Sequence, residues 1–389
     1  MINKSKVVVI ASAVRTPIGT YKGSLKNMKS HHLGAIVIKE VLKRSEFKKD
    51  EIDEVIMGQV LTAGAGQNPA RQASIDAGIP ITKPAHIVNQ VCGSGLRAVI
   101  SAYQSIKLGE SLNIIAGGQE NMSIAPHSIF YRDNKKISEK HLVDTMINDG
   151  LIDAFNNYHM GVTAENVAKK FNISRVDQDD FALNSQKKTE NAINTNRFEE
   201  ELVKINQPGI NLDTDEHPKY DTTIESLSNL KTVFKNDGSV TAGNASGIND
   251  GASALVLANE KQAKKGKPMA KIISYGFGGV EPDEMGLGPI PASKMALKKV
   301  GLSIDDLDLV ESNEAFAAQA CAVNKELGLD EAKVNVNGGA IALGHPVGAT
   351  GSIIMTKLVH ELKRRNGKYG LATMCIGGGH GIAVIIENC

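Results

Sequence analysis

The chain of 389 residues has no tryptophan, only 4% aromatic residues, and four cysteines without a CxxC pair. The missing CxxC spacing argues against a zinc knuckle or a disulfide framework, and free thiols favour a reducing compartment, so we expect a cytoplasmic protein. A formal net charge of +1 gives no electrostatic case for binding nucleic acid or an anionic membrane. The sequence lacks both the ~20 apolar residues of a membrane span and a signal peptide's longer apolar run.

What the chain does contain is glycine, 38 residues in all, in an ordinary globular composition of 41% apolar and 22% charged residues. The glycines predict many tight turns between strands and helices. The length predicts two or three domains rather than a single core.

The two ends of the sequence repeat each other. A helical pattern followed by an acidic strand occurs at 33–56 and again at 292–310, with Asp50 aligned to Asp305. Both halves continue with glycine-ended strands and a last apolar strand, which is delayed in the first half by a long insertion. The strands read as apolar runs without alternation, as in sheets covered on both faces. We therefore predict a first domain of 1–118 with 244–267, an inserted loop domain of 119–243, and a second domain of 268–389.

Cys92 is the most informative single residue. It follows an apolar, strand-like stretch and precedes Leu96, Val99, Ile100 and Tyr103, which recur at helical spacing. A thiol at the start of a helix is favoured as an anion, so we expect its pKa to fall below the ~8.5 of free cysteine. The sequence alone leaves two interpretations, a reactive nucleophile or a small buried core cysteine.

His345 and Cys375 lie in glycine-rich runs of the second half, where strands of an α/β fold end and chemistry is usually placed. His345 is a candidate to activate Cys92, and Cys375 a second exposed thiol. The glycines after Cys375 leave backbone N–H groups free to hold an oxyanion. Two cysteines and a histidine could also bind zinc, but there is no fourth ligand and no ligand spacing, so we predict no metal site.

A glycine pattern at 64–69 is faintly similar to a dinucleotide fingerprint. Pro69 stands in place of its last glycine, and no helix pattern starts where one is needed. We therefore predict no nucleotide cofactor at this segment.

Six runs together resemble the thiolase family, most closely its biosynthetic acetoacetyl-CoA thiolases, and they extend from end to end: 89–95, 159–161, 243–247, 313–316, 344–346 and 375–379. The resemblance implies an α/β fold of two repeated βαβαβαββ domains that form a five-layer αβαβα core, with an inserted loop domain. It also implies a homotetramer, a dimer of dimers, joined through a projecting loop at 121–149.

The resemblance assigns roles to five residues. Cys92 is the acyl-accepting nucleophile, Cys375 the acid and base at the substrate α-carbon, and His345 the group that helps to activate Cys92. His345 and a water held by Asn313 form one oxyanion hole, and the backbone N–H groups of Cys92 and Gly377 form the other. The implied activity is a reversible Claisen condensation of two acetyl-CoA to acetoacetyl-CoA and CoA through an acetyl-Cys92 intermediate, without a cofactor.

The resemblance also implies a set of substrate-binding and CoA-binding positions. They are Ser246, Ala315 and Phe316 along the pantetheine; Ser226, Phe234, Ala242 and Lys219 toward the rest of CoA; and His159, Met160 and Met285 around the short acyl group. Lys219 replaces an arginine of some relatives, and His380 stands at an often apolar position. His159 has a second interpretation, in which it only caps the helix that follows.

Two other functions remain open at this stage. A decarboxylating condensing enzyme of the ketoacyl-synthase type shares the fold and the nucleophilic cysteine, but it pairs the cysteine with two histidines or with His and Asn, whereas Cys375 takes that place here. A non-catalytic acyl-CoA-binding protein would not need Cys92, His345 and Cys375 together. Both alternatives are therefore disfavoured.

Overall fold

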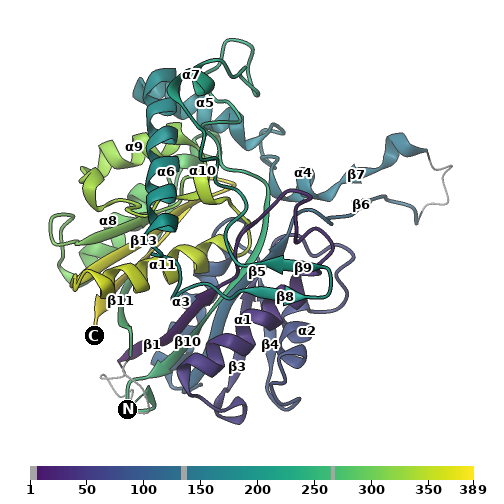
Figure 1. Ribbon diagram of the computed structural model, residues 1–389, viewed down its shortest axis with the longest axis vertical. Coiled ribbons are helices and arrows are strands. Elements are labelled where there is room, and N and C mark those ends of the chain that lie inside the picture. The colour runs from purple at the N-terminus through teal and green to yellow at the C-terminus, as the bar shows by residue number, and fades with distance from the viewer. Residues whose placement is uncertain (1–6, 133–137, 264–267) are drawn as a thin grey trace.

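Ten strands form one sheet within residues 7–132, 138–263 and 268–389, which the computed structural model describes (Figure 1). Nine of them run in the spatial order β12 (Leu309–Ser312), β13 (Tyr369–Ile376), β14 (His380–Asn388), β11 (Ala270–Gly279), β1 (Val8–Arg15), β10 (Asn249–Asn259), β5 (Asn113–Asn121), β3 (Glu54–Gly58), β4 (Ala85–Val88), and β2 (Gly19–Thr20) pairs with β10. The strands of the two halves are thus joined where β1 pairs with β11.

The α-helices in the described residues are α1 (Ser30–Ser45), α2 (Pro69–Asp76), α3 (Ser94–Leu108), α4 (Thr145–Gly150), α5 (Met160–Phe171), α6 (Arg175–Asn194), α7 (Ile224–Ser228), α8 (Pro289–Val300), α9 (Ala317–Leu327), α10 (Ala340–Leu343) and α11 (Thr350–Arg364). Of these, α1, α3 and α8 lie at helical patterns that the sequence predicts.

The predicted repeat is visible in matching hydrogen bonds. The Asp53 carboxylate accepts from the N–H groups of Leu112 and Asn113 at 2.7 and 3.0 Å. At the equivalent place of the second half, Asp308 accepts from the N–H groups of Lys368 and Tyr369 at 2.6 and 3.0 Å. The strand register also shifts at corresponding points, after Ile10 in β1 and after Ile272 in β11. Because these matches are local and detailed, they fix which residues of the two halves are equivalent.

Three apolar layers account for the five-layer core. Alternate strand residues such as Ile114 and Val384 pack with α3 and α11, which lie between the two halves of the sheet. On the opposite face Ile115 packs with α1, and in the second half Ala383 packs with α8 and α9. Burial of both strand faces explains why the strands lack an alternating pattern. The predicted αβαβα fold class is confirmed.

The insertion between β5 and β10 holds α4 to α7, of which α5 and α7 lie at the top of Figure 1. Two short hairpins belong to it, β6 (His127–Ser128) with β7 (Val143–Asp144) and β8 (Ile205–Gln207) with β9 (Ile210–Leu212). The strand β5 itself continues to Asn121, beyond the expected boundary at residue 118.

A buried ion cluster holds part of the insertion on the first half. Arg15, at the end of β1, is fully buried and contacts Glu201 and Asp215, each at 2.7 Å. Its guanidinium also lies over the Phe198 ring, 5.0 Å from the centroid.

Among the described helices, none is both long enough and apolar enough to cross a membrane.

Candidate active site

The turn that carries Cys92 holds a strained backbone. Val91 has a φ of +46°, a left-handed conformation that a β-branched residue rarely adopts. The Ser94 hydroxyl donates to the Val91 carbonyl at 2.6 Å and accepts from the Gln90 N–H at 2.9 Å, and Asn89 accepts from the Val91 N–H at 3.0 Å. These bonds stabilise the turn, so Cys92 is held in a fixed place just before α3.

The electrostatics of Cys92 differ from the prediction. Burial raises the pKa of the Cys92 thiol to about 11, although the backbone N–H groups of Gly377 and of Cys92 itself donate to the sulfur and lower it. The expected fall of the pKa below ~8.5 is therefore wrong, because desolvation outweighs the helix start. The two N–H groups aimed at the sulfur are the pair that the sequence predicts for an oxyanion hole, and they come from both halves of the chain.

Two hydrogen bonds hold His345 in the loop between α10 and α11. Its N–H donates to Asn249 Oδ1 at 2.9 Å, and its ring Nδ1 lies 2.7 Å from the Thr350 hydroxyl. Since that hydroxyl donates its one hydrogen to the Pro346 carbonyl at 2.9 Å, it accepts from Nδ1–H, and Nε2 is left as an acceptor. Among the described residues Nε2 has no hydrogen-bond partner. Burial lowers the pKa of His345 to about 4, so the resting ring is neutral.

Cys375 and Asn313 lie at the ends of the neighbouring strands β13 and β12. The expected exposure of the Cys375 thiol is wrong, because Cys375 is fully buried at the end of β13 and packs in an apolar cluster with Met160 and Met285. Burial and the nearby Cys92 thiol raise its pKa, so it is protonated at rest. Asn313 follows β12, and within the described residues both polar atoms of its buried amide lack a partner. An amide in this state is free to hold a water or a substrate oxygen.

A cavity of about 340 Å³ joins the two halves and the insertion. Ten predicted site residues line it: Cys92, His159, Met160, Phe234, Ala242, Ser246, Met285, Ala315, Phe316 and His345. The wall is anchored where the Ser246 N–H donates to the Ala315 carbonyl at 3.0 Å. The cavity thus brings together the predicted nucleophile, its base and most of the predicted substrate contacts.

His159 caps a helix, as one of its two interpretations predicts, and it also lines the cavity; its contact with substrate stays a prediction. It caps α5, because its Nδ1 accepts from the Gly161 N–H at 3.0 Å, and its ring stacks on Phe234 at 4.6 Å between centroids. Since Nδ1 accepts, the hydrogen of the neutral ring is on Nε2, which can donate to a substrate in the cavity. Burial lowers the pKa of His159, which keeps the ring neutral.

Two predicted CoA contacts lie on the surface outside the cavity. The Ser226 hydroxyl is used within α7, where it accepts from the Thr223 N–H at 3.0 Å, and Lys219 is exposed beside Gln186. His380 is also exposed, at the start of β14, whereas Cys375 is buried.

Sequence reasoning missed several wall residues: Met122, Gly150, Leu151, Val233, Thr241, Gly247, Ile248 and Val347. Gly247 and Val347 lie inside or directly beside motifs that were singled out, so the motifs did point to them. Met122 and Leu151 carry no sequence signal, because an apolar residue in an insertion reads as ordinary packing.

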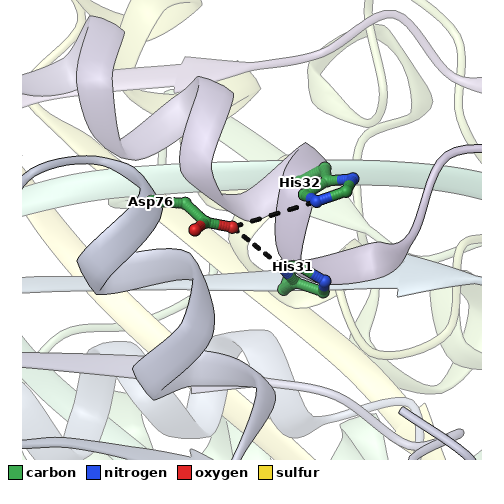
Figure 2. A group of neighbouring side chains, drawn as sticks. All are labelled: His31, His32 and Asp76. Atoms are coloured by element: carbon green, nitrogen blue, oxygen red, sulfur yellow. Dashed lines mark hydrogen bonds and ion pairs between the residues drawn. The ribbon is translucent and has the colours of Figure 1, made fainter. Parts of the chain in front are cut away.

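In the described part of the chain, one group of side chains has the spacing of a metal site. Figure 2 shows His31 and His32, from the first turn of α1, facing Asp76 at the end of α2. His31 Nδ1 lies 2.9 Å and His32 Nε2 4.0 Å from Asp76 Oδ2. The group lies outside the cavity that Cys92 lines, and the His32 and Asp76 side chains are about half exposed, so we assign it no part in the chemistry of the cavity.

Two family models match the chain in succession. The model described as thiolase, N-terminal domain, matches residues 8–261, and that described as thiolase, C-terminal domain, matches residues 266–388.

Curated relatives and solved structures are similar over almost the whole length. An acetyl-CoA acetyltransferase of Rhizobium meliloti (strain 1021) is 53% identical, with 98% of each chain covered, and one of Paracoccus denitrificans is 52% identical over 98% of this chain and 99% of its own. The crystal structure of the Bacillus anthracis acetyl-CoA acetyltransferase has a TM-score of 0.97 at 43% identity and full coverage of both chains. Human mitochondrial 3-ketoacyl-CoA thiolase in complex with CoA has a TM-score of 0.95 at 43% identity and covers 99% and 98% of the two chains.

Proposed function

Because the chain belongs to the thiolase family, we propose that it is an acetyl-CoA C-acetyltransferase, which reversibly condenses two acetyl-CoA to acetoacetyl-CoA and CoA. The observation that carries this proposal is the cavity in which Cys92 meets His345, with Cys375 buried beside it. A carbon–carbon bond between two thioesters needs a nucleophile, a second acid and base, and donors for two oxyanions. The proposal assigns these tasks to Cys92 and His345 in the cavity and to the buried Cys375 and Asn313.

The first half-reaction transfers an acetyl group to Cys92. As the neutral thiol attacks the thioester carbonyl, its proton passes to His345 Nε2, the free acceptor of the ring. The backbone N–H groups of Cys92 and Gly377, already aimed at the sulfur, hold the oxyanion of the tetrahedral intermediate. When CoA leaves as a thiolate, it takes the proton of Cys375, and Cys375 becomes the base.

The second half-reaction forms the carbon–carbon bond. The Cys375 thiolate removes an α-proton from the second acetyl-CoA, and the enolate oxygen is held by the protonated His345 and by a water bound to Asn313, whose amide is otherwise unpaired among the described residues. The enolate carbon attacks the acetyl carbonyl on Cys92, and the Cys92 sulfur leaves and recovers its proton from His345. Both cysteines and the histidine return to their first protonation states without a metal or redox cofactor.

The wall of the cavity favours a short acyl group. Met160 and Met285 are 7% and 3% exposed, and a Cβ on Gly377 would lie 3.5 Å from the Met160 sulfur. We propose that these two side chains close the space beyond a four-carbon acyl group, while Ser246, Ala315 and Phe316 line the pantetheine. Phe234 and Ala242 contact the CoA on the cavity wall, and Lys219 and Ser226 contact its outer part from the surface.

The deciding experiment mixes the protein with acetoacetyl-CoA and CoA and measures acetyl-CoA. We expect fast thiolysis of acetoacetyl-CoA and much slower thiolysis of 3-ketohexanoyl-CoA, because one clash in an apolar pocket is worth ~1–3 kcal/mol, or about 10–200-fold. No acetyl-CoA would contradict the activity. Equal kcat/KM from four to ten carbons would contradict the short acyl range and favour a broad degradative thiolase.

Three further predictions remain proposals. We keep the division into 1–118 with 244–267, 119–243 and 268–389, and a cytoplasmic location consistent with the free cysteines among the described residues. We also propose a homotetramer joined through 121–149, because β6 and β7 extend away from the body in Figure 1, and Phe130 beyond β6 is 95% exposed. Sedimentation of the intact protein as a monomer at micromolar concentration would contradict the last proposal.

A further inference from the structure

Glu120 is a buried carboxylate at the end of β5 that the reaction above does not use. It is fully buried, and its two oxygens accept from three backbone N–H groups, those of Val60 at 2.9 Å, Leu61 at 3.3 Å and Gly348 at 3.0 Å. Among the ion pairs of the described residues none includes Glu120. Among the described residues the carboxyl group is therefore held by backbone N–H groups and not by a cation.

The three donors come from the two halves of the chain. Val60 and Leu61 follow β3 in the first half, and Gly348 lies in the loop of the second half that also carries His345. The carboxylate thus ties the loop of the catalytic histidine to the half that carries Cys92. Asn249, at the start of β10 in the first half, holds the same loop at the His345 N–H.

The loop has no room to shift without disturbing the Cys92 turn. A Cβ on Gly58 would lie 2.7 Å from the Gly348 carbonyl oxygen, one on Gly118 would lie 2.3 Å from it, and one on Gly95 would lie 3.1 Å from it. Gly95 is in the first turn of α3, three residues after Cys92. A Cβ on Gly348 itself would lie 2.6 Å from Glu120 Oε2. The three glycines let the loop lie directly against the start of α3, and Glu120 holds it there.

We propose that Glu120 is a positioning residue, which sets the separation between His345 and Cys92 by holding the Gly348 N–H. This proposal rests on the proposed function, in which His345 is the base for Cys92. A displacement of about 1 Å between reacting groups costs on the order of 100-fold in rate. Loss of the carboxylate should therefore slow the chemistry at Cys92 more than it weakens substrate binding.

The chain offers a matched control in Asp250, the neighbouring buried carboxylate on β10. Asp250 accepts from the N–H groups of Met122 and Ser123 at 2.8 and 3.0 Å, both in the first half or its insertion, and among the described residues no hydrogen bond of its carboxylate reaches the histidine loop. Burial raises the pKa of Glu120 to about 7 and that of Asp250 to about 6, so the two acids share their electrostatic setting. They differ in the backbone groups that they hold, since only Glu120 accepts from the histidine loop.

The test compares E120A, E120Q and D250N with the parent protein in two assays mapped to Cys92 by mass spectrometry. The first is the single-turnover rate of acetylation by acetyl-CoA, together with the concentration at half saturation. The second is alkylation by iodoacetamide near neutral pH, which needs the thiol and its base but no CoA ester. Circular dichroism and urea unfolding check that each variant folds.

We expect E120A to slow both reactions of Cys92 by about 10–100-fold, with little change in the half-saturating concentration of acetyl-CoA. E120Q should recover part of the rate, because its amide oxygen can still accept from Val60 and Gly348 and gives up only the longest bond, to Leu61. D250N should react at the parent rate even if it is less stable.

Wild-type rates in folded E120Q and E120A, or equal slowing in D250N, would overturn the proposal. The two proposals fail separately. If the parent protein is not acetylated at Cys92 but E120A still slows its alkylation, the proposed function fails and the positioning role stands.

Discussion

The two halves of the chain have equivalent strands and helices, and they differ in the residues at the ends of these elements. Counted from the anchors at Asp53 and Asp308, the position six residues after Asn113 is Gln119, and the position six residues after Tyr369 is Cys375. Two residues before the central helices, the first half has Cys92 and the second has Gly348. Each half therefore supplies one thiol and, at the other position, an amide or a glycine.

This difference shows how a repeated scaffold produces a single reaction centre. The thiol before α3 sits in a turn that exposes it to the cavity, whereas the thiol at the end of β13 is fully buried. The glycine in the second half is the residue that Glu120 can reach, and no larger residue fits there. The scaffold sets where functional residues stand, and the non-equivalent side chains decide what each position does.

The sharpest test of this comparison removes one thiol at a time. C92A should lose both acetyl exchange between CoA molecules and condensation, down to the background rate, because the acyl group has no acceptor. C375A should keep measurable acetyl exchange but lose condensation by about 10²–10⁴-fold, the usual contribution of a positioned acid and base. The measurements are isotope exchange into acetyl-CoA and the formation of acetoacetyl-CoA.

Each thiol variant is the other's control, since both replace a cysteine in the same cavity region. If C375A lost exchange as completely as C92A while remaining folded, the two thiols would not have separate tasks. An acetyl group mapped only to Cys375 would reverse the assignment of the two halves.

The buried ion pairs of the halves allow a comparison of stability. In the first half Arg15 has two carboxylate partners, Glu201 and Asp215, and in the second half Lys357 has one, Glu311 at 2.8 Å. R15A should cost about 3–5 kcal/mol of unfolding free energy, because it leaves two buried charges unpaired. K357A should cost less, since burial already raises the pKa of Glu311 to about 7 and the stranded carboxyl can take up a proton.

Urea unfolding at pH 7 measures both variants. A larger loss for K357A than for R15A would mean that the second half depends more on its ion pair than the first. At pH 6 more of Glu311 is protonated, so the loss of unfolding free energy caused by K357A should be smaller than at pH 7. This comparison gives an internal check.

The smallest expected effect is a loss of stability in acid, to which the insertion and the second half should contribute equally. His217, from the insertion, and His345, from the second half, both contact Asn249, and burial lowers the pKa of each to about 4. A lowered pKa gives stability that is complete above the ordinary value of about 6.5 and is lost as the pH falls toward 4. Each histidine should therefore cost about 2 kcal/mol between pH 7 and pH 5.

H217N and H345N should each reduce this pH-dependent loss by a similar amount in urea unfolding at the two pH values. Unequal reductions would show that one of the two rings becomes hydrated before the protein unfolds.

The sequence predicted the layout of the site better than its electrostatics. The repeat, the insertion and the turns that carry Cys92 and His345 depend on local patterns, and these can be found without coordinates. The prediction of a lowered pKa for Cys92 is wrong because burial depends on how the two halves assemble, and a local sequence pattern does not contain that information. For the same reason Glu120 was not noticed, since its three donors are far apart in the chain and meet only in the folded protein.

The single chain also changes how this site can evolve. In a symmetric pair of identical copies, a cysteine at the position of Cys375 would require one at Gln119 as well, and every substitution would alter two pockets together. With both copies in one chain, each position can mutate alone, so Gln119 and Cys375 can serve different tasks. The equivalence of Gln119 and Cys375 therefore marks a place where broken symmetry, and not a new fold, supplies the second thiol.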